Sequence, residues 1–477
     1  MDGHKKISLG TKFGYATAAL GDACSYSFIG AFLLFFLTSV VGINPVIAGS
    51  IAAIGAIWDS ICSPVIGYIS DKSTSKYGRR RPFLLLTAVP LGVSIIMLFS
   101  SINLSESFKY FYYGALVIIF WGLFSSFYVP YLAFGAEITG DYGERTVLRF
   151  YAYVFNFIGA VIGVVFPTFI VDYLCRNGVT VEKAWQSAAV IVGIFTTVSI
   201  LVTWNCTKGK DKIQNRDSTE KRDDSYICSF INSMITEYWE ILRLKPIKYL
   251  IGGSIFYLVA GTMVNSDRMY FLTYNLGMEP GVVSRVYLIA SISGVVFSPF
   301  IIRCSNILDK RQAYIICSAI SFTGIIIAWI TGIHSFWGVI AYSFIFSLGN
   351  SCYWQLFPAM IYDVCEVDEL ISGQRREGII MSVQSLAEAL SSAAAVQVLG
   401  IILGLSGFNG NASVQTELTL NWIGNCFTII PAIFMLLTII MVIKYPITKK
   451  RYILMQLALE KKNKGEEYEE EELKKLI

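Results

Sequence analysis

Residues 57–83 read IWDSICSPVIGYISDKSTSKYGRRRPF, an apolar run that contains one carboxylate and passes directly into a basic connection. A helix needs about 20 apolar residues to cross the hydrocarbon core of a membrane. Runs of that length recur at residues 13–41, 46–69, 82–101, 109–135, 149–174, 184–205, 247–277, 283–303, 313–332, 336–362, 377–405 and 419–444. Strand-like alternation is absent, and only helices satisfy so much backbone in lipid outside a closed barrel. The sequence therefore predicts an all-α membrane protein with twelve transmembrane helices.

The composition agrees with a chain dissolved in lipid. Of its 477 residues, 55% are hydrophobic and only 15% are charged, whereas a soluble globular chain carries about a quarter charged residues. The N-terminal MDGHKKISLGTKFG lacks the short apolar core and cleavage site of a signal peptide, so we expect a retained first span. The ten cysteines form no C-x-x-C pair and there are only two histidines. We therefore expect neither disulfides nor a metal site, and no cofactor besides a coupling ion.

Basic residues gather in alternate connections, and this sets the expected orientation. The connections at 72–81, 303–311 and 375–376 are rich in Lys and Arg, whereas those at 42–46 and 406–418 contain none. By the positive-inside rule, the basic connections and both termini lie on the cytoplasmic side of the cell membrane.

The long charged connection splits the spans into six and six. The predicted domains are a first six-helix bundle at 1–205, a cytoplasmic linker at 206–246, a second bundle at 247–444 and a cytoplasmic tail at 445–477. The tail carries alternating blocks of charge, which predicts a solvated helix.

The two halves share weak internal repeats. SPVIGYISDKSTSKYGRRR at 63–81 resembles SPFIIRCSNILDKR at 298–311, and VPYLAFGAEITGDYGER at 129–145 resembles FPAMIYDVCEVDELISGQRR at 357–376. The matching prolines of the two pairs are separated by nearly the same number of residues. Parallel six-span halves with a binding site between them at mid-membrane are the major facilitator arrangement.

Charged residues at the cytoplasmic helix ends are candidates for a gate that closes in one state and opens in the other. They also fit a simpler role, since charges at a membrane surface orient helices without gating anything. The gate candidates are Asp71, Arg79, Arg80, Glu137, Asp141, Arg145, Asp363 and Arg375.

Three stretches resemble the glycoside–pentoside–hexuronide:cation symporters: GDACSYSFIGAFLLFFLTSVVGI at 21–43, IWDSICSPVIGYISDKSTSKYGRRRPF at 57–83, and DVCEVDELISGQRREGIIMSVQS at 363–385. The resemblance covers residues from about 11 to 445. It implies a secondary transporter that imports a sugar or glycoside with a cation, H⁺ or Na⁺, by alternating access.

The resemblance also implies roles for individual residues. Asp59 matches the cation-binding aspartate of span two and Ser125 a hydroxyl of the same site, while Ser63 replaces the family's second carboxylate. Arg149, Trp354, Gln384 and Ser385 match residues that line or border the sugar path.

Other positions depart from the family pattern. Ala23 replaces the sugar-binding aspartate, with Asp22 one residue earlier, and Tyr128 replaces an acid of span four. In span eleven Ala389 replaces a lysine beside Glu388. Sugar and cation identity therefore stay open.

The chemistry of single residues supports the same sites. A charged aspartate at a helix centre costs about 2.5–3.5 kcal/mol on insertion scales, so Asp59 should face the protein interior. It fits a proton site, a Na⁺ site completed by hydroxyl and carbonyl oxygens, or a structural hydrogen bond. Asp22 with Tyr26 fits a sugar grip, although the small residues around Asp22 also suit close helix packing. Glu388 is a second candidate for protonation, and Asp267 with Arg268 is expected to line an outer vestibule.

The sequence favours a secondary transporter whose partners are a sugar or glycoside and membrane lipid. No metal cluster, nucleophile–base spacing or phosphate loop points to an enzyme, and no nucleic-acid partner is expected. The alternatives are a transporter of another amphipathic solute, such as a lysolipid, and a membrane sensor that does not transport.

Overall fold

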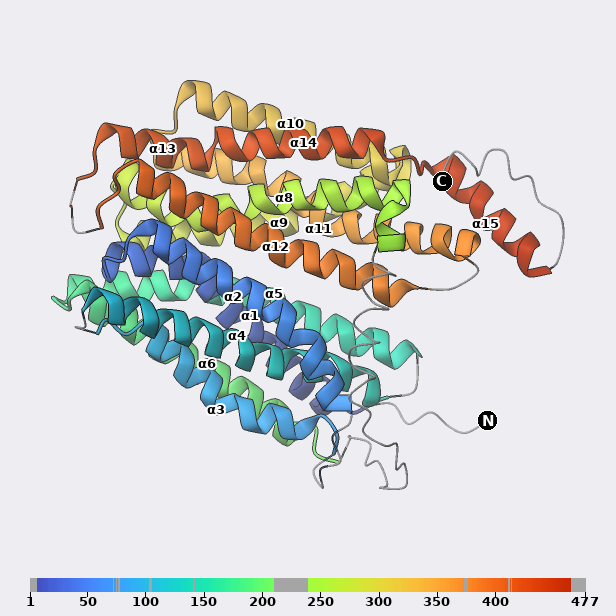
Figure 1. The fold of residues 1–477 in the computed structure, drawn as a ribbon, viewed down its shortest axis with the longest axis horizontal. Coiled ribbons are helices and arrows are strands. Elements are labelled where there is room, and N and C mark those ends of the chain that lie inside the picture. The colour runs from blue at the N-terminus through green and yellow to red at the C-terminus, as the bar shows by residue number, and fades with distance from the viewer. Residues whose placement is uncertain are drawn as a thin grey trace. The chain divides into compact units, whose positions relative to one another are not determined.

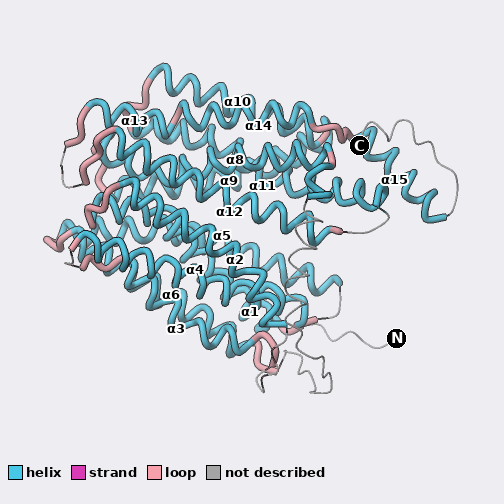
Figure 2. Tube along the Cα trace, viewed as in Figure 1, coloured by secondary structure: helices cyan, strands magenta, loops and turns pink. Residues whose placement is uncertain are grey.

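The computed structural model describes residues 7–71, 73, 75, 78–102, 105–139, 142–209, 239–372, 376–410, 412 and 414–464. Within these ranges all regular secondary structure is helical (Figures 1 and 2). Eleven described helical segments are long and apolar enough to cross a membrane, with the two successive helices of Glu417–Lys444 counted as one segment. The all-α prediction is confirmed, and a count of twelve spans is consistent with it.

The helices have the following bounds in chain order: α1 Leu9–Phe35, continued by the π-helical η1 Phe36–Val40; α2 Pro45–Asp71; α3 Arg81–Leu98; α4 Glu106–Glu137; α5 Tyr142–Arg176; α6 Val181–Cys206; α8 Lys245–Tyr270, continued by η2 Phe271–Asn275; α9 Pro280–Leu308; α10 Lys310–Thr331; α11 Phe336–Ser372; α12 Glu377–Leu405; α13 Glu417–Phe427; α14 Ile429–Lys444; and α15 Lys449–Lys464.

Two predicted spans differ in detail from the structure. The span at 336–362 lies in α11, which is long enough but is not among the eleven, because polar residues such as Asn350 and Gln355 interrupt its apolar run. The span at 419–444 is divided at Thr428 into α13 and α14. The ring of Pro431 would clash with the carbonyl group four residues earlier, so a new helix begins at Ile429.

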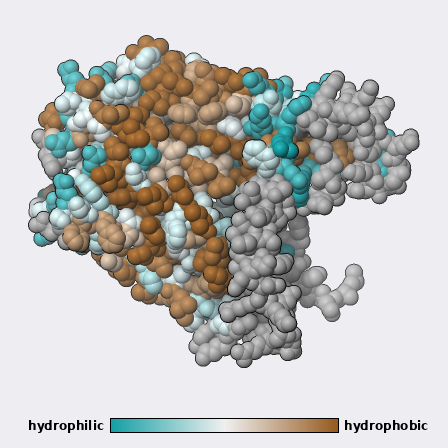
Figure 3. Space-filling view, in the orientation of Figure 1, coloured by the Kyte–Doolittle hydropathy of each residue, from teal (hydrophilic) through white to brown (hydrophobic). Residues whose placement is uncertain are grey.

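The outer surface is apolar along the sides of the helices. In the space-filling view, hydrophobic residues cover much of the visible face and hydrophilic residues gather toward the helix ends (Figure 3). Large apolar side chains such as Leu86, Phe150 and Ile330 are mostly exposed. A continuous apolar surface of this kind suits contact with lipid rather than water.

The described residues form two compact units. The first comprises the described part of Met1–Thr219 with Asn265–Leu288 and Val396–Gly424. The second comprises the described part of Glu220–Val264, Ile289–Ala395 and Asn425–Ile477.

In the first unit, α1 packs on α5 and α6, α2 on α4, and α3 on α4 and α6. Glycines let the backbones meet. A Cβ atom on Gly159 of α5 would lie 2.1 Å from the carbonyl oxygen of Leu20, and one on Gly163 would lie 2.3 Å from that of Cys24. Because lipid tails are as apolar as the helices, close contact at small residues is a main source of packing energy.

The two later segments of the first unit pack on the ends of α1 and α2. The hydroxyl groups of Tyr270 and Thr38 lie 2.5 Å apart in a hydrogen bond. A Cβ atom on Gly400 of α12 would lie 2.5 Å from the carbonyl oxygen of Pro45. The ends of α8 and α12 therefore cover the ends of α1 and α2 that lie away from the basic connections.

In the second unit, α10 packs on α11 and α14, and α11 contacts α15. The expectation of a fully solvated tail is wrong for α15. Its Met455 and Ala458 are buried, and the Tyr452 hydroxyl donates a hydrogen bond of 3.1 Å to Glu366 of α11. Residues 465–477 lie outside the described residues.

We expect Gly159→Ala to destabilise the protein by about 1–3 kcal/mol, because the new methyl group would push α5 away from α1. Gly30→Ala on α1 is the matched control, since a Cβ atom there meets nothing within 4 Å and alanine favours helix. Thermal unfolding of the purified protein measures both. Equal melting temperatures for the two variants would show that the contact is not tight.

Candidate functional site

The acid of α2 meets a hydroxyl group of α4. The Ser125 Oγ atom lies 2.5 Å from the Asp59 Oδ1 atom and donates to it. The two helices approach closely here, since a Cβ atom on Gly55 would lie 2.5 Å from the ring of Trp121. Ser63 lies half-buried one turn further along α2. Of the three predicted cation ligands, the structure brings Asp59 and Ser125 together.

A second acid, Asp22 of α1, lies in the same unit. Its side chain is only 4% exposed, and its Oδ1 atom has no hydrogen-bond partner among the described residues. The neighbouring Gly21 presses against α6, where the Thr196 hydroxyl donates to its carbonyl oxygen. Asp22 and Asp59 are close enough for their charges to interact. A buried carboxylate oxygen of this kind needs a partner, such as a water molecule, an ion or a substrate hydroxyl group.

Tyr128 connects the predicted sugar residues of the first unit. It lies within electrostatic reach of Asp22, Tyr26, Arg149 and Tyr15. The other three predicted sugar residues of this half therefore lie within electrostatic reach of Tyr128. The sequence interpretation missed Tyr15, which precedes Asp22 by seven residues. That spacing is two helical turns and could have indicated a shared face.

A polar network occupies the second unit. The Gln384 Nε2 atom lies 2.6 Å from Ser254 Oγ, 3.0 Å from Glu388 Oε1 and 3.3 Å from Tyr353 Oη. The ring of Trp354 meets that of Tyr353 edge-on at 5.3 Å.

Within this unit the structure brings Gln384 and Glu388 together. Trp354 is 54% exposed, and its ring contacts that of its chain neighbour Tyr353. Ser385 is exposed and takes no part in the described network. Ser254 and Tyr353 were missed, because each is an ordinary polar residue in an apolar run.

Four predicted gate residues form one cluster in the first unit. Arg79 and Arg80 both donate to Glu137, the latter at 3.2 Å, and Arg80 also pairs with Asp71. Burial acts to raise the pKa of the Glu137 carboxyl, but hydrogen bonds and charge from the two arginines outweigh it and hold this pKa below its ordinary value. Glu137 is thus ionised at neutral pH.

The remaining gate candidates do not belong to this cluster. Arg145 is exposed and donates to the Thr139 carbonyl oxygen at 2.8 Å, outside the cluster. Asp363 pairs with Lys310 at 2.7 Å. Asp141 and Arg375 lie outside the described residues.

Further ion pairs lie at these helix ends. Arg376 contacts Asp368 at 2.7 Å and Glu240 at 2.9 Å. The hydrogen bonds that Arg376 donates to Asp368 raise the pKa of Arg376. Lys12 of α1 contacts Glu144 of α5 at 2.7 Å.

Asp267 is not exposed in a vestibule as predicted. Its side chain is fully buried, and neither carboxylate oxygen has a hydrogen-bond partner in the part of the chain that the structure describes. The Arg268 guanidinium instead lies over the ring of Tyr287, 5.2 Å from its centre. The two neighbours on α8 therefore do not pair with each other.

Long membrane-crossing helices that bury acids and polar networks define a membrane transporter, in which intramembrane ionisable groups mark substrate and ion pathways. The family described as MFS/sugar transport protein matches residues 14–449, and the chain belongs to it. The protein is thus a transporter of the major facilitator superfamily and not an enzyme.

Several relatives share nearly the whole chain. The Uncharacterized symporter YnaJ of Bacillus subtilis is 26% identical, covering 96% of each chain. The isoprimeverose transporter of Lactiplantibacillus pentosus is 22% identical over 92% of this chain and 88% of its own. The Sodium-dependent lysophosphatidylcholine symporter 1 of Xenopus tropicalis is 22% identical over 94% of this chain and 89% of its own.

Solved structures support the fold. A bacterial homologue of the human drug peptide transporters PepT1 and PepT2 aligns with a TM-score of 0.65 at 14% identity, covering 92% of this chain and 98% of that chain. At this identity the likeness concerns the fold alone.

We expect Arg80→Gln to destabilise the protein by about 1.5–3 kcal/mol, because the variant loses one of the two arginines that donate to the part-buried Glu137. Arg145→Gln is the control on an exposed arginine and should change stability little. Thermal unfolding in detergent measures both.

The pKa of Glu137 is lowered, so the difference between the Arg80→Gln variant and the parent protein should persist above the carboxyl's ordinary pKa of 4.5. It should shrink only at more acid pH, where Glu137 becomes protonated. A variant as stable as Arg145→Gln would contradict the structural role of the cluster.

Proposed function

We propose that the protein imports a sugar or glycoside across the cell membrane together with a cation, H⁺ or Na⁺, by alternating access. The observation that carries this proposal is the hydrogen bond between Ser125 and Asp59 inside the span, with the buried Asp22 within electrostatic reach. The sugar-transport family and the isoprimeverose transporter among the relatives support a sugar as the substrate.

The two acids offer a physical basis for coupling. Two carboxylates close together in a span cannot both be ionised without a large cost. A proton on Asp59, or Na⁺ held by Asp59, Ser125 and Ser63, removes that repulsion. Burial still opposes a charge on Asp22, and hydrogen bonds accepted from sugar hydroxyls would offset that cost. By linkage, the sugar must strengthen cation binding by the same factor.

The remaining site residues are assigned to the substrate by their chemistry. Tyr26 and Trp354 present aromatic faces suited to the apolar side of a sugar ring. Tyr128, Arg149, Gln384, Ser385 and Glu388 supply donors and acceptors for its hydroxyl groups.

The orientation and domain limits complete the proposal. Both termini lie in the cytoplasm, bundles at 1–205 and 247–444 are joined by the linker at 206–246, and the residues from 445 form the tail. Asp71, Arg79, Arg80, Glu137 and Asp363 act at the cytoplasmic gate, and their pairs change between states.

We expect Asp59→Asn to abolish gradient-driven accumulation while leaving exchange or binding of the substrate, because an amide neither takes up a proton nor balances a cation. Glu106→Gln removes an exposed acid and is the control. The measurement is uptake into proteoliposomes over a panel of glycosides and lysophosphatidylcholine, with Na⁺ and proton gradients imposed separately.

Full accumulation by Asp59→Asn would exclude the coupling role. Uptake of the lysolipid but of no glycoside would favour the transport of an amphipathic solute, a reading that the lysophosphatidylcholine symporter among the relatives supports. Binding without any uptake would indicate a sensor.

We expect Gln384→Ala to weaken substrate binding at least tenfold, because the amide lies within hydrogen-bond distance of Ser254, Tyr353 and Glu388 and holds them in place. Gln186→Ala on α6, where the amide contacts only Ser100 among the described residues, is the control. Equilibrium binding of the best transported glycoside measures the loss. An unchanged affinity in Gln384→Ala would remove this network from the site.

A further inference from the structure

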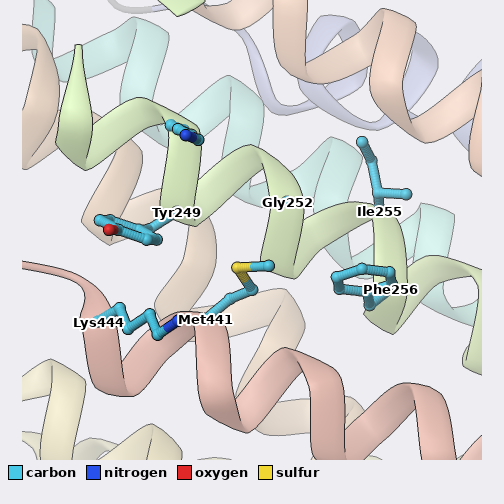
Figure 4. A pocket seen from close by; sticks show the side chains of 7 residues that line it. Tyr249, Gly252, Ile255, Phe256, Met441 and Lys444 are labelled. Atoms are coloured by element: carbon cyan, nitrogen blue, oxygen red, sulfur yellow. The ribbon is translucent and has the colours of Figure 1, made fainter. Parts of the chain in front are cut away.

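A groove lies between α8 and α14 of the second unit. It has a volume of about 480 Å³, and its lining includes Lys248, Gly252 and Phe256 of α8 and Met441 and Lys444 of α14 (Figure 4). Lys248 lies in the first turn of α8 and Lys444 is the last residue of α14. Since the helices run in opposite directions here, both lysines belong to the same end of the groove.

The walls away from the lysines are apolar. Phe256 lies two turns beyond Lys248 on α8, and Met441 lies about one turn before Lys444 on α14. The groove exists because Gly252 has no side chain. A Cβ atom there would lie 3.6 Å from the Met441 sulfur, an ordinary contact distance. A methyl group therefore fits at this position, and a longer side chain would take up space in the groove.

The basic end of the groove has no described counter-charge. Both lysines are exposed, and neither ammonium group forms an ion pair or hydrogen bond with any residue that the structure describes, whereas Lys310 and Arg376 of the same unit do. The start of α8 and the end of α14 meet here, so the opposite partial charges of the two helix ends largely offset each other. An anion at this end would meet two ammonium groups.

We propose that this groove binds one anionic phospholipid, with its phosphate between Lys248 and Lys444 and one acyl chain along Phe256 and Met441. The groove suits both the head group and the acyl chain. Basic residues at the membrane surface attract anionic head groups, and the apolar walls continue into the depth of the span. A zwitterionic lipid would bring its own cation toward the lysines. The inference does not depend on which solute the protein transports.

The test compares retention of phosphatidylglycerol and of phosphatidylcholine with the same acyl chains by the purified full chain, using native mass spectrometry. We expect phosphatidylglycerol to bind at least tenfold more tightly than phosphatidylcholine. The Lys248→Gln/Lys444→Gln variant should lose this preference. The matched control, Lys245→Gln/Lys450→Gln, removes the same charge near the same helix ends outside the groove and should keep it.

A second variant tests the apolar part. Gly252→Leu keeps both lysines and fills the groove, so it should weaken phosphatidylglycerol binding at least tenfold while the protein still elutes as a single folded species. Water-soluble glycerol phosphate should fail to compete with the lipid. The proposal would be overturned by equal retention of the two lipids or by loss of the lipid preference in the control variant. Full phosphatidylglycerol binding by Gly252→Leu, or competition by glycerol phosphate, would also overturn it.

Discussion

The contact of backbone against backbone at glycines is the constraint on which the first unit depends. Lipid gives helices no hydrophobic reason to associate, so they must gain energy from close packing and hydrogen bonds. Gly159 and Gly163 bring α5 onto α1, and Gly21 brings α1 onto α6. As a result α1 is enclosed along most of its length, and Asp22 is buried by helices rather than exposed to lipid. The acid is therefore held in a protein interior, where its charge affects nearby groups strongly.

Close contact at glycines also joins α2 to α12. Gly49 of α2 and Gly400 of α12 approach closely, and Gly410 lies against the Thr38 carbonyl oxygen. Contacts between glycines have no interlocking side chains, so they can separate and re-form with little rearrangement. The Tyr270–Thr38 hydrogen bond and the rings of Phe35 and Tyr270, 5.2 Å apart, close this end of the unit in the present structure.

The sequence was informative where a property is local. Hydropathy located the spans, and the charge pattern located the residues of the Arg79–Arg80–Glu137 cluster. Partner choice was not predictable, since Lys12 meets Glu144 only because α1 lies against α5. Tyr15, Ser254 and Tyr353 resemble many other residues in apolar runs until folding brings them beside Tyr128 or Gln384. Asp267 and Arg268 suggested a shared site, but successive helix residues point about 100° apart, and the structure gives them separate surroundings.

A symporter must link ligand binding to the opening and closing of its two sides. In the proposed mechanism these two events are separate, because both acids lie within the first unit. Asp22 and Asp59 interact through space, so a cation on Asp59 changes the substrate affinity of Asp22 without any movement of helices. Closing and opening instead depend on the helix ends, where Tyr270 meets Thr38 and Arg80 meets Glu137. Coupling then requires only that the helix ends open and close readily when cation and substrate are both bound or both absent. A cation bound alone would therefore raise the affinity for the sugar but would not open or close the helix ends. The relief of charge repulsion is local to the two acids and does not extend to the helix ends.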